Sequence, residues 1–371
     1  MSALHAAKRI VVKVGSILLV DPKTGQVHRR WLEGLAADVA RLRARGQEVI
    51  LVSSGAIALG RRHLGLRTGK LKLEESQAAA ATGQIHLAKA YQDAMSAHGI
   101  SVAQVLLTID DTEQRRKYLN ARSTIDTLLR LGALPVINEN DTVATAEIRF
   151  GDNDRLSARV AEMTSSDCLV LLSDVDGLYS ADPTIDAGAH LVKRVERITP
   201  EIEAMAGQPR TGDGSGGMVT KLIAARIATS AGAAMVIARG SVEQPIRTLE
   251  DGGPCTWFDA QGNPRTARKQ WIAGTLQPSG SVVVDDGAVR ALAAGKSLLP
   301  AGVTSIAGAF QRGDAVYIKD ASGRDLGRGL VAYSSTDARA LIGHKSSEIE
   351  ALLGYRGRDE MIHRDDLVLN D

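Results

Sequence analysis

The sequence contains little cysteine, few aromatic residues and almost no net charge. Of its 371 residues only two are cysteines, Cys168 and Cys255, which lie far apart and outside any paired motif. This distribution excludes a zinc ribbon and argues against a disulfide framework. Because the formal net charge is only +2, the bulk charge predicts neither a nucleic-acid nor a membrane partner.

A long apolar run and a histidine-based catalytic motif are also missing. Lys13 interrupts the apolar run of the N-terminal segment MSALHAAKRIVVKVG, so that segment supplies neither a signal-peptide core nor a membrane span. The eight histidines are scattered, without a zinc-type pair or an arrangement of nucleophile, histidine and acid. We therefore expect a cytoplasmic protein.

What is present, up to about residue 240, is an alternation of two kinds of segment. Short β-branched runs read as strands buried on both faces, and the longer segments between them carry apolar residues at helical spacing. This alternation predicts an α/β fold in which a mostly parallel sheet lies between helical layers. Ligands of such sheets usually bind beyond the carboxyl ends of the strands. The runs that predict strands are RIVVKVG, QEVILVSSG, SVAQVLL, ALPVINEN, DCLVLLSD and AAMVIARG.

The pattern changes in the last third of the chain. The segment GGPCTWFDAQGNPRTARKQWIAG is rich in turn formers and predicts strand and linker. From about residue 277 onward, short strands, one small helix over 287–294 and hairpin turns predict a compact, mostly β module. A chain of this length accommodates two domains, and we place them at 1–265 and 277–371.

Carboxylates and carboxamides are concentrated in one stretch, PVINENDTVATAEIRFGDND (135–154). Asn140 and Asp141 stand where an apolar run ends, and Asn153 and Asp154 close the stretch. Such groups could form a solvated turn, a metal site or a pocket for a positively charged ligand. The twelve-residue calcium-loop pattern, with its central glycine and terminal glutamate, is absent. We favour the ligand pocket.

One glycine-rich segment is a candidate for phosphate binding, although a Walker A motif is absent. GDGSGG (212–217) matches G-x-G-x-x-G formally, but it does not follow a buried strand, so a dinucleotide-binding site is excluded by its context. It leads into a helix whose first turn carries Thr220 and Lys221, which can aim backbone N–H groups and an ammonium at phosphate oxygens. A surface loop with an exposed lysine explains the segment equally well.

Lys13 is a second candidate cation. It interrupts a run otherwise fit for complete burial, where an unpaired lysine is rare. Gly15 follows at once, which indicates that the strand ends there and that the backbone turns close to a ligand. A lysine that reaches the surface from the strand edge is the alternative, and we favour a functional role.

Two polar turns follow other predicted strands. Ser54 and Gly55 stand before a probable helix start, where the serine could cap the helix and the helix N-terminus could bind an anion. Ser173 and Asp174 end the run DCLVLLSD and Asp176 follows it, and an Asp-Gly turn explains this segment without any ligand. Neither turn identifies a site by itself.

Together these segments resemble the amino acid kinase family, and within it the members that phosphorylate free glutamate. The resemblance covers essentially the whole chain, and the residues from FQRGD onward are similar to the PUA domain that many bacterial members append. The family has an αβα sandwich fold. The motifs VVKVGS, VSSGAIALG, LNAR, PVINENDTVATAEIRFGDNDRLSA, LLSDVDGLYSADP and GSGGMVTKL occur in the family's order and at its spacing.

The resemblance implies a role for each matching residue. Lys13 and Lys221 would contact the phosphoryl group that is transferred, and Asp154 would orient both lysines. L-glutamate would be held by Ser54, Gly55, Asp141 and Asn153. ATP would be held by Lys13, Ser173, Asp174, Ser215, Gly216, Gly217, Met218, Val219, Thr220 and Lys221.

The resemblance also implies ATP and Mg²⁺ as cofactors, a homo-oligomer, the first step of proline biosynthesis and, in many members, feedback inhibition by proline. The metal ligands are not identifiable from the sequence, since Mg²⁺ bound mainly through phosphates and water needs no protein cage. Val219 departs from the small polar residue usual in the family at this position. Backbone N–H groups do most of the binding in such a loop, so the assignment stands.

Elementary chemistry agrees with glutamate as the substrate. Its side-chain carboxylate, with a reference pKa of about 4.3, is ionised at neutral pH and needs no general base. Its α-ammonium is costly to bury unpaired, and the acidic stretch supplies acceptors for it. An acetylated substrate would lack that charge, so a kinase for acetylglutamate is a weaker alternative, as is one for aspartate.

An RNA-binding regulator is the competing class, because PUA domains recognise RNA in several modification enzymes. Residues 277–371 contain 11 Lys+Arg against 13 Asp+Glu, and aromatic residues make up only 3% of the chain. An RNA-binding face is usually basic and supplies aromatic rings for stacking. We therefore expect no nucleic-acid partner, and a module that packs against the kinase domain or tunes assembly.

Overall fold

The computed structural model describes residues 3–67, 69–144, 152–207, 217–275 and 277–370. The chain divides into two compact units, Met1–Pro264 and Arg265–Asp371, and each is described by itself. The division falls at the start of helix α12 (Pro264–Thr275). The expectation of strand and linker in this region is therefore wrong for its second half. A proline is tolerated in the first turn of a helix, so Pro264 begins α12 and does not exclude it.

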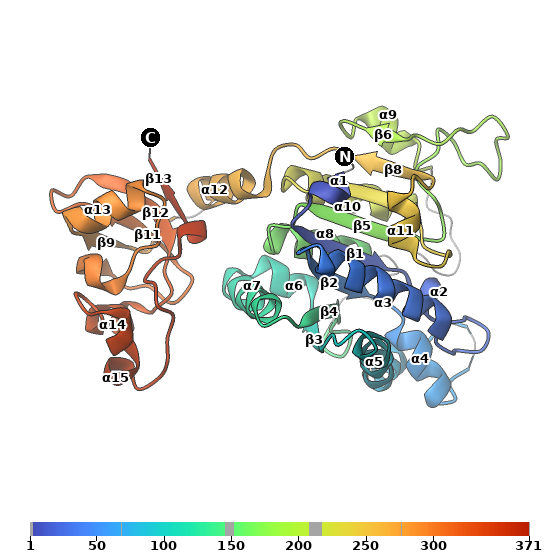
Figure 1. Cartoon of the computed structure of the whole chain (residues 1–371), viewed down its shortest axis with the longest axis horizontal. Helices are drawn as coiled ribbons and strands as arrows, with labels where there is room; N and C mark the ends of the chain where they lie inside the picture. Colours follow the sequence, from blue (N-terminus) through green and yellow to red (C-terminus); the bar gives the residue numbers. More distant parts are fainter. Residues whose placement is uncertain (1–2, 68, 145–151, 208–216, 276, 371) are drawn as a thin grey trace. The chain divides into compact units, whose positions relative to one another are not determined.

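The N-terminal unit is built on an eight-stranded sheet in the order β3-β4-β2-β1-β5-β7-β8-β6 (Figure 1). Neighbouring strands are parallel except β7 and β8, which are antiparallel. Lys13 lies beside Val52 on one side and Leu171 on the other. The strands are β1 Arg9–Val14, β2 Glu48–Ser53, β3 Val102–Leu107, β4 Leu134–Glu139, β5 Cys168–Ser173, β6 Arg194–Val195, β7 Ala234–Arg239 and β8 Cys255–Phe258.

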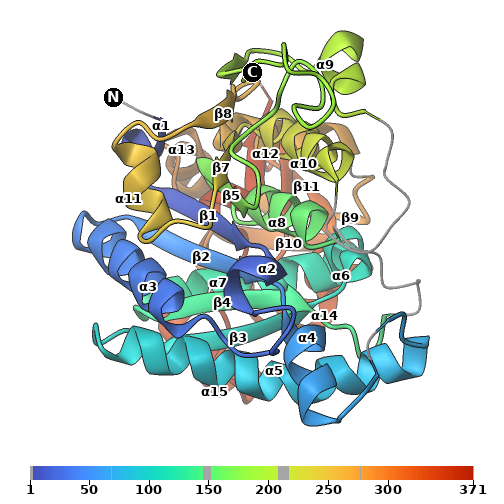
Figure 2. The ribbon, with the colours of Figure 1, turned by 90° about the vertical axis from the view of Figure 1, so that its right-hand side faces the viewer.

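Helices cover both faces of this sheet, which confirms the predicted αβα sandwich (Figure 2). Side chains alternate along β1, so Ile10 and Val12 belong to one core and Val11 to the other. The first core is covered by α1 Ala3–Ala6, α2 Ser16–Leu19, α3 Arg29–Ala44, α4 Ala56–His63, α5 Leu73–Ser96 and α11 Pro245–Glu250. The second is covered by α6 Ile109–Glu113, α7 Arg115–Arg130, α8 Asp152–Met163, α9 Pro200–Ala204 and α10 Met218–Ser230.

The polar segments gather at the carboxyl edge of the parallel strands. Ser54 follows β2, Asp141 follows β4, and Ser173 is the last residue of β5. Since β2, β4 and β5 are parallel to β1 or to its neighbours, these residues lie at one edge of the sheet. This is the edge at which α/β sheets bind their ligands.

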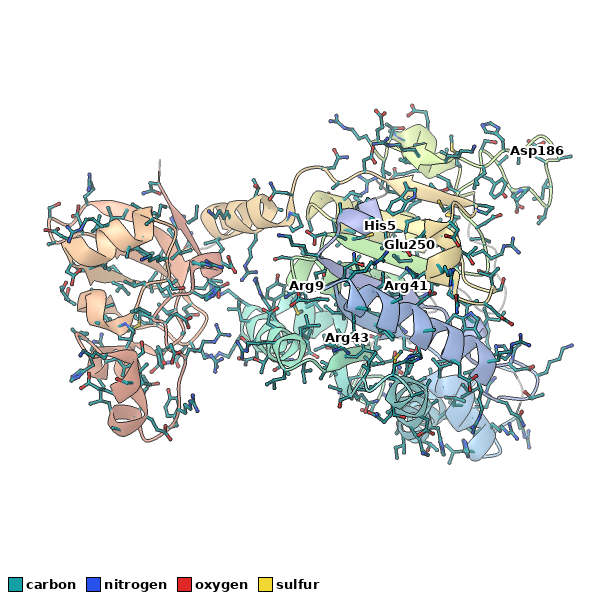
Figure 3. All side chains as sticks on the ribbon, viewed as in Figure 1. His5, Arg9, Arg41, Arg43, Asp186 and Glu250 are labelled. Carbon is teal, nitrogen blue, oxygen red and sulfur yellow. The ribbon has the colours of Figure 1, made fainter. Side chains whose placement is uncertain are left out.

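The amino edge of the sheet carries ion pairs instead. Arg9, the first residue of β1, lies 2.7 Å from Glu48 and 2.8 Å from Asp126. Glu250, the last residue of α11, contacts Arg41 and lies 3.6 Å from His5. Figure 3 labels Arg9, His5, Arg41 and Glu250, which come from β1, α1, α3 and α11. The pairs of Arg9 join β1 to β2 and to α7, and those of Glu250 join α11 to α3 and α1.

The C-terminal unit has its own five-stranded sheet, in the order β10-β9-β11-β12-β13. Its pairs are antiparallel except β9 with β11, which is parallel. Val282, Val316 and Ile362 belong to its separate core. The strands are β9 Gly280–Val284, β10 Val303–Gly308, β11 Ala315–Lys319, β12 Asp325–Leu330 and β13 Leu367–Leu369; the helices are α13 Asp286–Ala293, α14 Ser335–Ala340 and α15 Ile349–Leu353. Across both units, none of the described helices is long and apolar enough to cross a membrane.

Candidate active site

Asp154 lies between two lysines that come from distant parts of the chain. Asp154 is in the first turn of α8, Lys13 is in β1, and Lys221 is in the first turn of α10. The Nζ atom of Lys13 is 2.6 Å from Oδ1 of Asp154, and the Nζ atom of Lys221 is 3.2 Å from Oδ2. The exposed fraction is 1% for Asp154, 5% for Lys221 and 9% for Lys13. The structure thus brings together the three residues predicted to be catalytic.

The two lysines keep the carboxyl group of Asp154 ionised. Burial alone would raise its pKa, but the attraction of Lys13 and Lys221 and their hydrogen bonds outweigh this effect and hold the pKa below its usual value. Two ammonium groups face one carboxylate, so this buried cluster carries an excess of positive charge. An anion that arrives beside the lysines can neutralise that charge.

The start of α10 is fixed against Asp154. The hydroxyl of Thr220 lies 3.1 Å from Oδ2 of Asp154 and 2.9 Å from the carbonyl oxygen of Gly217, and it can donate to either. The first N–H groups of a helix have no partner within the helix, and the helix dipole makes this end attractive to phosphate. Met218 and Val219 form the first turn together with Thr220 and Lys221. Two further residues predicted to bind ATP, Ser215 and Gly216, lie outside the described residues.

Ser173 and Asp174 form the neighbouring part of the predicted ATP site. The hydroxyl of Ser173 donates to Oδ1 of Asp174 at 2.9 Å, and its carbonyl accepts the N–H of Gly240 at 2.7 Å. Lys13 pairs with Leu171 in the sheet, so Ser173 lies two residues further along β5 than the residue beside the lysine. Asp174 is exposed. This places a hydroxyl and an accessible carboxylate next to the lysine cluster, at the same edge of the sheet.

Ser54 and Asn153, both predicted to bind glutamate, contact each other. The amide nitrogen of Asn153 donates to the hydroxyl oxygen of Ser54 at 2.9 Å, and the backbone N–H of Ser54 donates to Val14 at 3.2 Å. The carbonyl oxygen Oδ1 of Asn153 is buried and has no hydrogen-bond partner among the described residues. A buried acceptor without a partner is costly. It can accept a hydrogen bond from a ligand's ammonium, immediately next to the Asp154 cluster.

The remaining two residues predicted to bind glutamate frame this contact. Gly55 caps the N-terminus of α4 with a φ of 107°, a left-handed conformation that favours glycine. A Cβ atom there would also lie 3.2 Å from Cγ2 of Val20. Asp141 follows β4, which is the neighbour of β2 in the sheet, and only 8% of it is exposed. A buried carboxylate at this edge can pair with a positively charged group of a ligand.

The same residues offer few ligands for a metal ion. Within the described ranges, no group of three or more His, Cys, Asp or Glu side chains is placed to hold a metal ion. The oxygens of Asp154 already face Lys13, Lys221 and Thr220, whereas Asp174 is exposed and pairs only locally with Ser173. The site therefore fits a cation that is bound chiefly through the phosphates of a nucleotide.

The sequence did not predict the contacts that α5 makes with this site. Three of its side chains, Gln77, Gln84 and Tyr91, reach the segments that carry Asp141 and Ser54. The signal available in the sequence was their spacing. Polar residues seven positions apart lie on one face of a helix, and here they recur in an alanine-rich segment.

Two family models match the chain, and the curated proteins it resembles share one name. The model of the amino acid kinase family matches residues 8–239, and that of the PUA domain matches residues 280–353. The chain is 68% identical over 369 residues to a glutamate 5-kinase from Paramagnetospirillum magneticum, with 100% of both chains covered. It is 60% identical over 360 residues to a glutamate 5-kinase from Rhodospirillum rubrum, covering 97% of this chain and 96% of that protein. A glutamate 5-kinase from Nitrobacter winogradskyi is 59% identical over 366 residues, covering 99% of this chain and 97% of that protein. The chain therefore belongs to the amino acid kinase family, among the glutamate 5-kinases, and carries a C-terminal PUA domain.

Proposed function

We propose that this chain transfers the γ-phosphoryl group of ATP to the side-chain carboxylate of L-glutamate. The product is γ-glutamyl 5-phosphate, an acyl phosphate, and the reaction is the first step of proline biosynthesis. The observation that carries the proposal is the cluster of Lys13, Asp154 and Lys221, which adjoins the Asn153–Ser54 contact. Membership of the glutamate 5-kinase group supports it.

The reaction requires two anions to approach each other. A carboxylate oxygen of glutamate attacks the γ-phosphorus, the bond from that phosphorus to the β,γ-bridging oxygen breaks, and ADP leaves with the electron pair. No proton moves, because the carboxylate is already ionised at neutral pH. The chain must therefore supply positive charge and alignment, not a base.

In this mechanism the lysines neutralise the charge and Asp154 fixes their positions. The ammonium groups of Lys13 and Lys221 lie on the two oxygens of one buried carboxylate, so both are held before the nucleotide arrives. Such preorganisation removes a cost that flexible lysines would otherwise incur in the transition state. The N-terminus of α10 and Ser173 would bind the remaining phosphates and the nucleotide.

Glutamate would bind on the other side of Asp154. The unpartnered carbonyl oxygen of Asn153 and the carboxylate of Asp141 would receive its α-ammonium. The hydroxyl of Ser54, which already accepts from Asn153, would donate to one of its carboxylates. Mg²⁺, when bound, would offset the charge of the nucleotide phosphates, and Asp174, an exposed carboxylate beside Ser173, would help to hold it. Cytoplasmic location, assembly into a homo-oligomer and feedback inhibition by proline are proposed from the family alone, and no nucleic-acid partner is assigned.

Trapping with hydroxylamine tests reaction and substrate together. Purified protein would be incubated with ATP, Mg²⁺ and hydroxylamine, with L-glutamate, N-acetylglutamate or L-aspartate, and the hydroxamate would be measured; Lys221→Ala serves as the control. We expect hydroxamate from glutamate only, and its loss in the variant. Product from acetylglutamate would contradict the proposed ammonium pocket. No product from any of the three would favour a binding protein, which an RNA titration across salt concentrations would test next.

A further inference from the structure

Helix α5 presents three polar side chains on one face. Gln77, Gln84 and Tyr91 are each seven positions apart, which is close to two helical turns and aligns them along the helix. Gln84 is 7% exposed and Tyr91 is fully buried. We call these three residues the α5 polar row. Buried polar groups must find hydrogen-bond partners, and the acceptors to which this row donates belong to the two segments that would hold glutamate.

The two glutamines hold the backbone on either side of Asp141. The amide nitrogen of Gln84 donates to the carbonyl oxygen of Glu139 at 3.4 Å, and that of Gln77 donates to the carbonyl oxygen of Ala144 at 3.2 Å. Gln104 of β3 donates to Oε1 of Gln84 at 2.9 Å. This bond fixes which way the amide of Gln84 points, and it directs the nitrogen toward the loop.

Tyr91 supports the serine turn in the same way. Its hydroxyl is 2.9 Å from the hydroxyl of Ser53, which in turn donates to the carbonyl oxygen of Ser54 at 3.1 Å. Tyr91 is therefore the donor to Ser53. The chain of bonds ends at the backbone of Ser54, the residue that contacts Asn153.

Close packing fixes α5 against the helix that follows this turn. A Cβ atom added at Gly60 of α4 would lie 1.7 Å from the carbonyl oxygen of Ala79, and one added at Gly83 of α5 would lie 1.7 Å from that of Ala56. Only glycine at both positions lets the two backbones approach this closely. Helix α4 begins immediately after Gly55, so α5 is tied to the serine turn by packing as well as by Tyr91.

We propose that the α5 polar row sets the geometry of the glutamate pocket, with Gln77 and Gln84 as positioning residues for the Asp141 loop and Tyr91 as the positioning residue for Ser54. The inference rests on the proposed function, since it assigns these two segments to glutamate. None of the three side chains needs to touch substrate. The contacts of the row go to Ser53 and to the backbone of Glu139 and Ala144, so we expect its effect to fall on glutamate binding.

Substitutions along α5 test this with a matched control. Gln77→Leu and Gln84→Leu remove the donors at similar volume, and Tyr91→Phe removes only the hydroxyl. Gln92→Leu is the control on the same helix, because Oε1 of Gln92 accepts the N–H of Val102 at the start of β3. For each variant, KM for glutamate, KM for ATP, kcat of hydroxamate formation and the urea midpoint of unfolding would be measured.

We expect KM for glutamate to rise roughly three- to tenfold in each of the three variants, the range of one neutral hydrogen bond. KM for ATP and kcat should stay within about twofold, a split that loss of folded protein alone does not produce. Gln92→Leu should change the urea midpoint at most. If the buried Gln84→Leu does not fold, the half-buried Gln77→Leu carries the test.

An unchanged KM for glutamate in Gln77→Leu and Tyr91→Phe would overturn the inference, as would an equal change in both KM values. A wild-type protein that makes no hydroxamate from glutamate would overturn the proposed function and the inference with it. The two failures are distinguishable, because the first appears only in the variants and the second in the wild type.

Discussion

Replacing Asp154 by asparagine should separate phosphoryl transfer from nucleotide binding. The change keeps the shape of the side chain and removes its charge, so Lys13 and Lys221 lose the carboxylate that lies 2.6 and 3.2 Å from them. Breaking a buried ion pair by removing one partner costs about 3–5 kcal/mol of folding free energy. The carbonyl oxygen of asparagine still accepts from the lysines, so we expect the lower end of this range. The lysines also lose their fixed positions, and we expect kcat to fall by roughly 10²-fold.

Nucleotide affinity should move in the opposite direction. In the wild type the carboxylate of Asp154 competes with phosphate oxygens for the two ammonium groups, whereas in Asp154→Asn this competing negative charge is removed. ADP should therefore bind the variant at least as tightly as the wild type, and it should stabilise the variant more. Urea unfolding with and without ADP, calorimetric titration of ADP and kcat of hydroxamate formation measure the three quantities.

The control makes the same chemical change at the opposite edge of the sheet. The carboxylate of Asp167 accepts the backbone N–H groups of Lys8 and Arg9 at 2.7 and 2.9 Å, so Asp167→Asn should lower stability without changing kcat. The reasoning is refuted if kcat of Asp154→Asn stays within about threefold of the wild type, or if ADP affinity falls in parallel with kcat.

Two further predictions concern pH and packing. The lysines lower the pKa of Asp154 in the folded state. Its ionisation therefore stabilises the fold at pH values above the unfolded-state pKa of about 3.9. This stabilisation is lost as the pH falls through the lower folded-state pKa. The difference in unfolding free energy between wild type and Asp154→Asn should therefore be constant near neutral pH and shrink below about pH 4; a difference that is independent of pH contradicts this assignment. Gly83→Ala would place a Cβ atom 1.7 Å from the carbonyl oxygen of Ala56, so α4 and α5 must separate. Because the clash is with backbone, we expect the upper part of the range of about 1–3 kcal/mol, which exceeds the helix-propensity gain of about 1 kcal/mol. The urea midpoint should fall and KM for glutamate should rise, and an unchanged midpoint would count against the packing argument.

The sheet could be predicted from the sequence because the apolar composition of its strands indicates that they are buried. Every residue of Cys168–Ser173 and of Leu134–Glu139 is buried, and continuous apolar runs are typical of parallel strands that are covered on both faces. Lys13 was recognisable for the same reason, since it is charged in a run that requires burial. Its contact with Asp154, which also contacts Lys221, could be predicted only through the family, because the three residues come from segments far apart in the chain.

The parts that the sequence did not reveal depend on tertiary contacts. Gln77 and Gln84 are ordinary residues on a helix, and nothing local shows that their amide groups reach the backbone of Glu139 and Ala144. The helix Pro264–Thr275 was not predicted, because turn-forming residues surround it. In the C-terminal unit, hairpin turns predict antiparallel pairs, whereas the parallel pairing of β9 with β11 joins strands that are not consecutive in the chain.

The central claim is that the side-chain carboxylate of glutamate attacks the γ-phosphorus of ATP at the Lys13–Asp154–Lys221 cluster. Glutamate labelled with ¹⁸O in that carboxylate tests it directly, with ATP, Mg²⁺ and hydroxylamine present. Hydroxylamine attacks the carbonyl carbon of the acyl phosphate, so the released phosphate should carry one ¹⁸O atom from glutamate, detectable by mass spectrometry. Phosphate without ¹⁸O, formed together with ADP, would mean that water is the acceptor and would contradict the account.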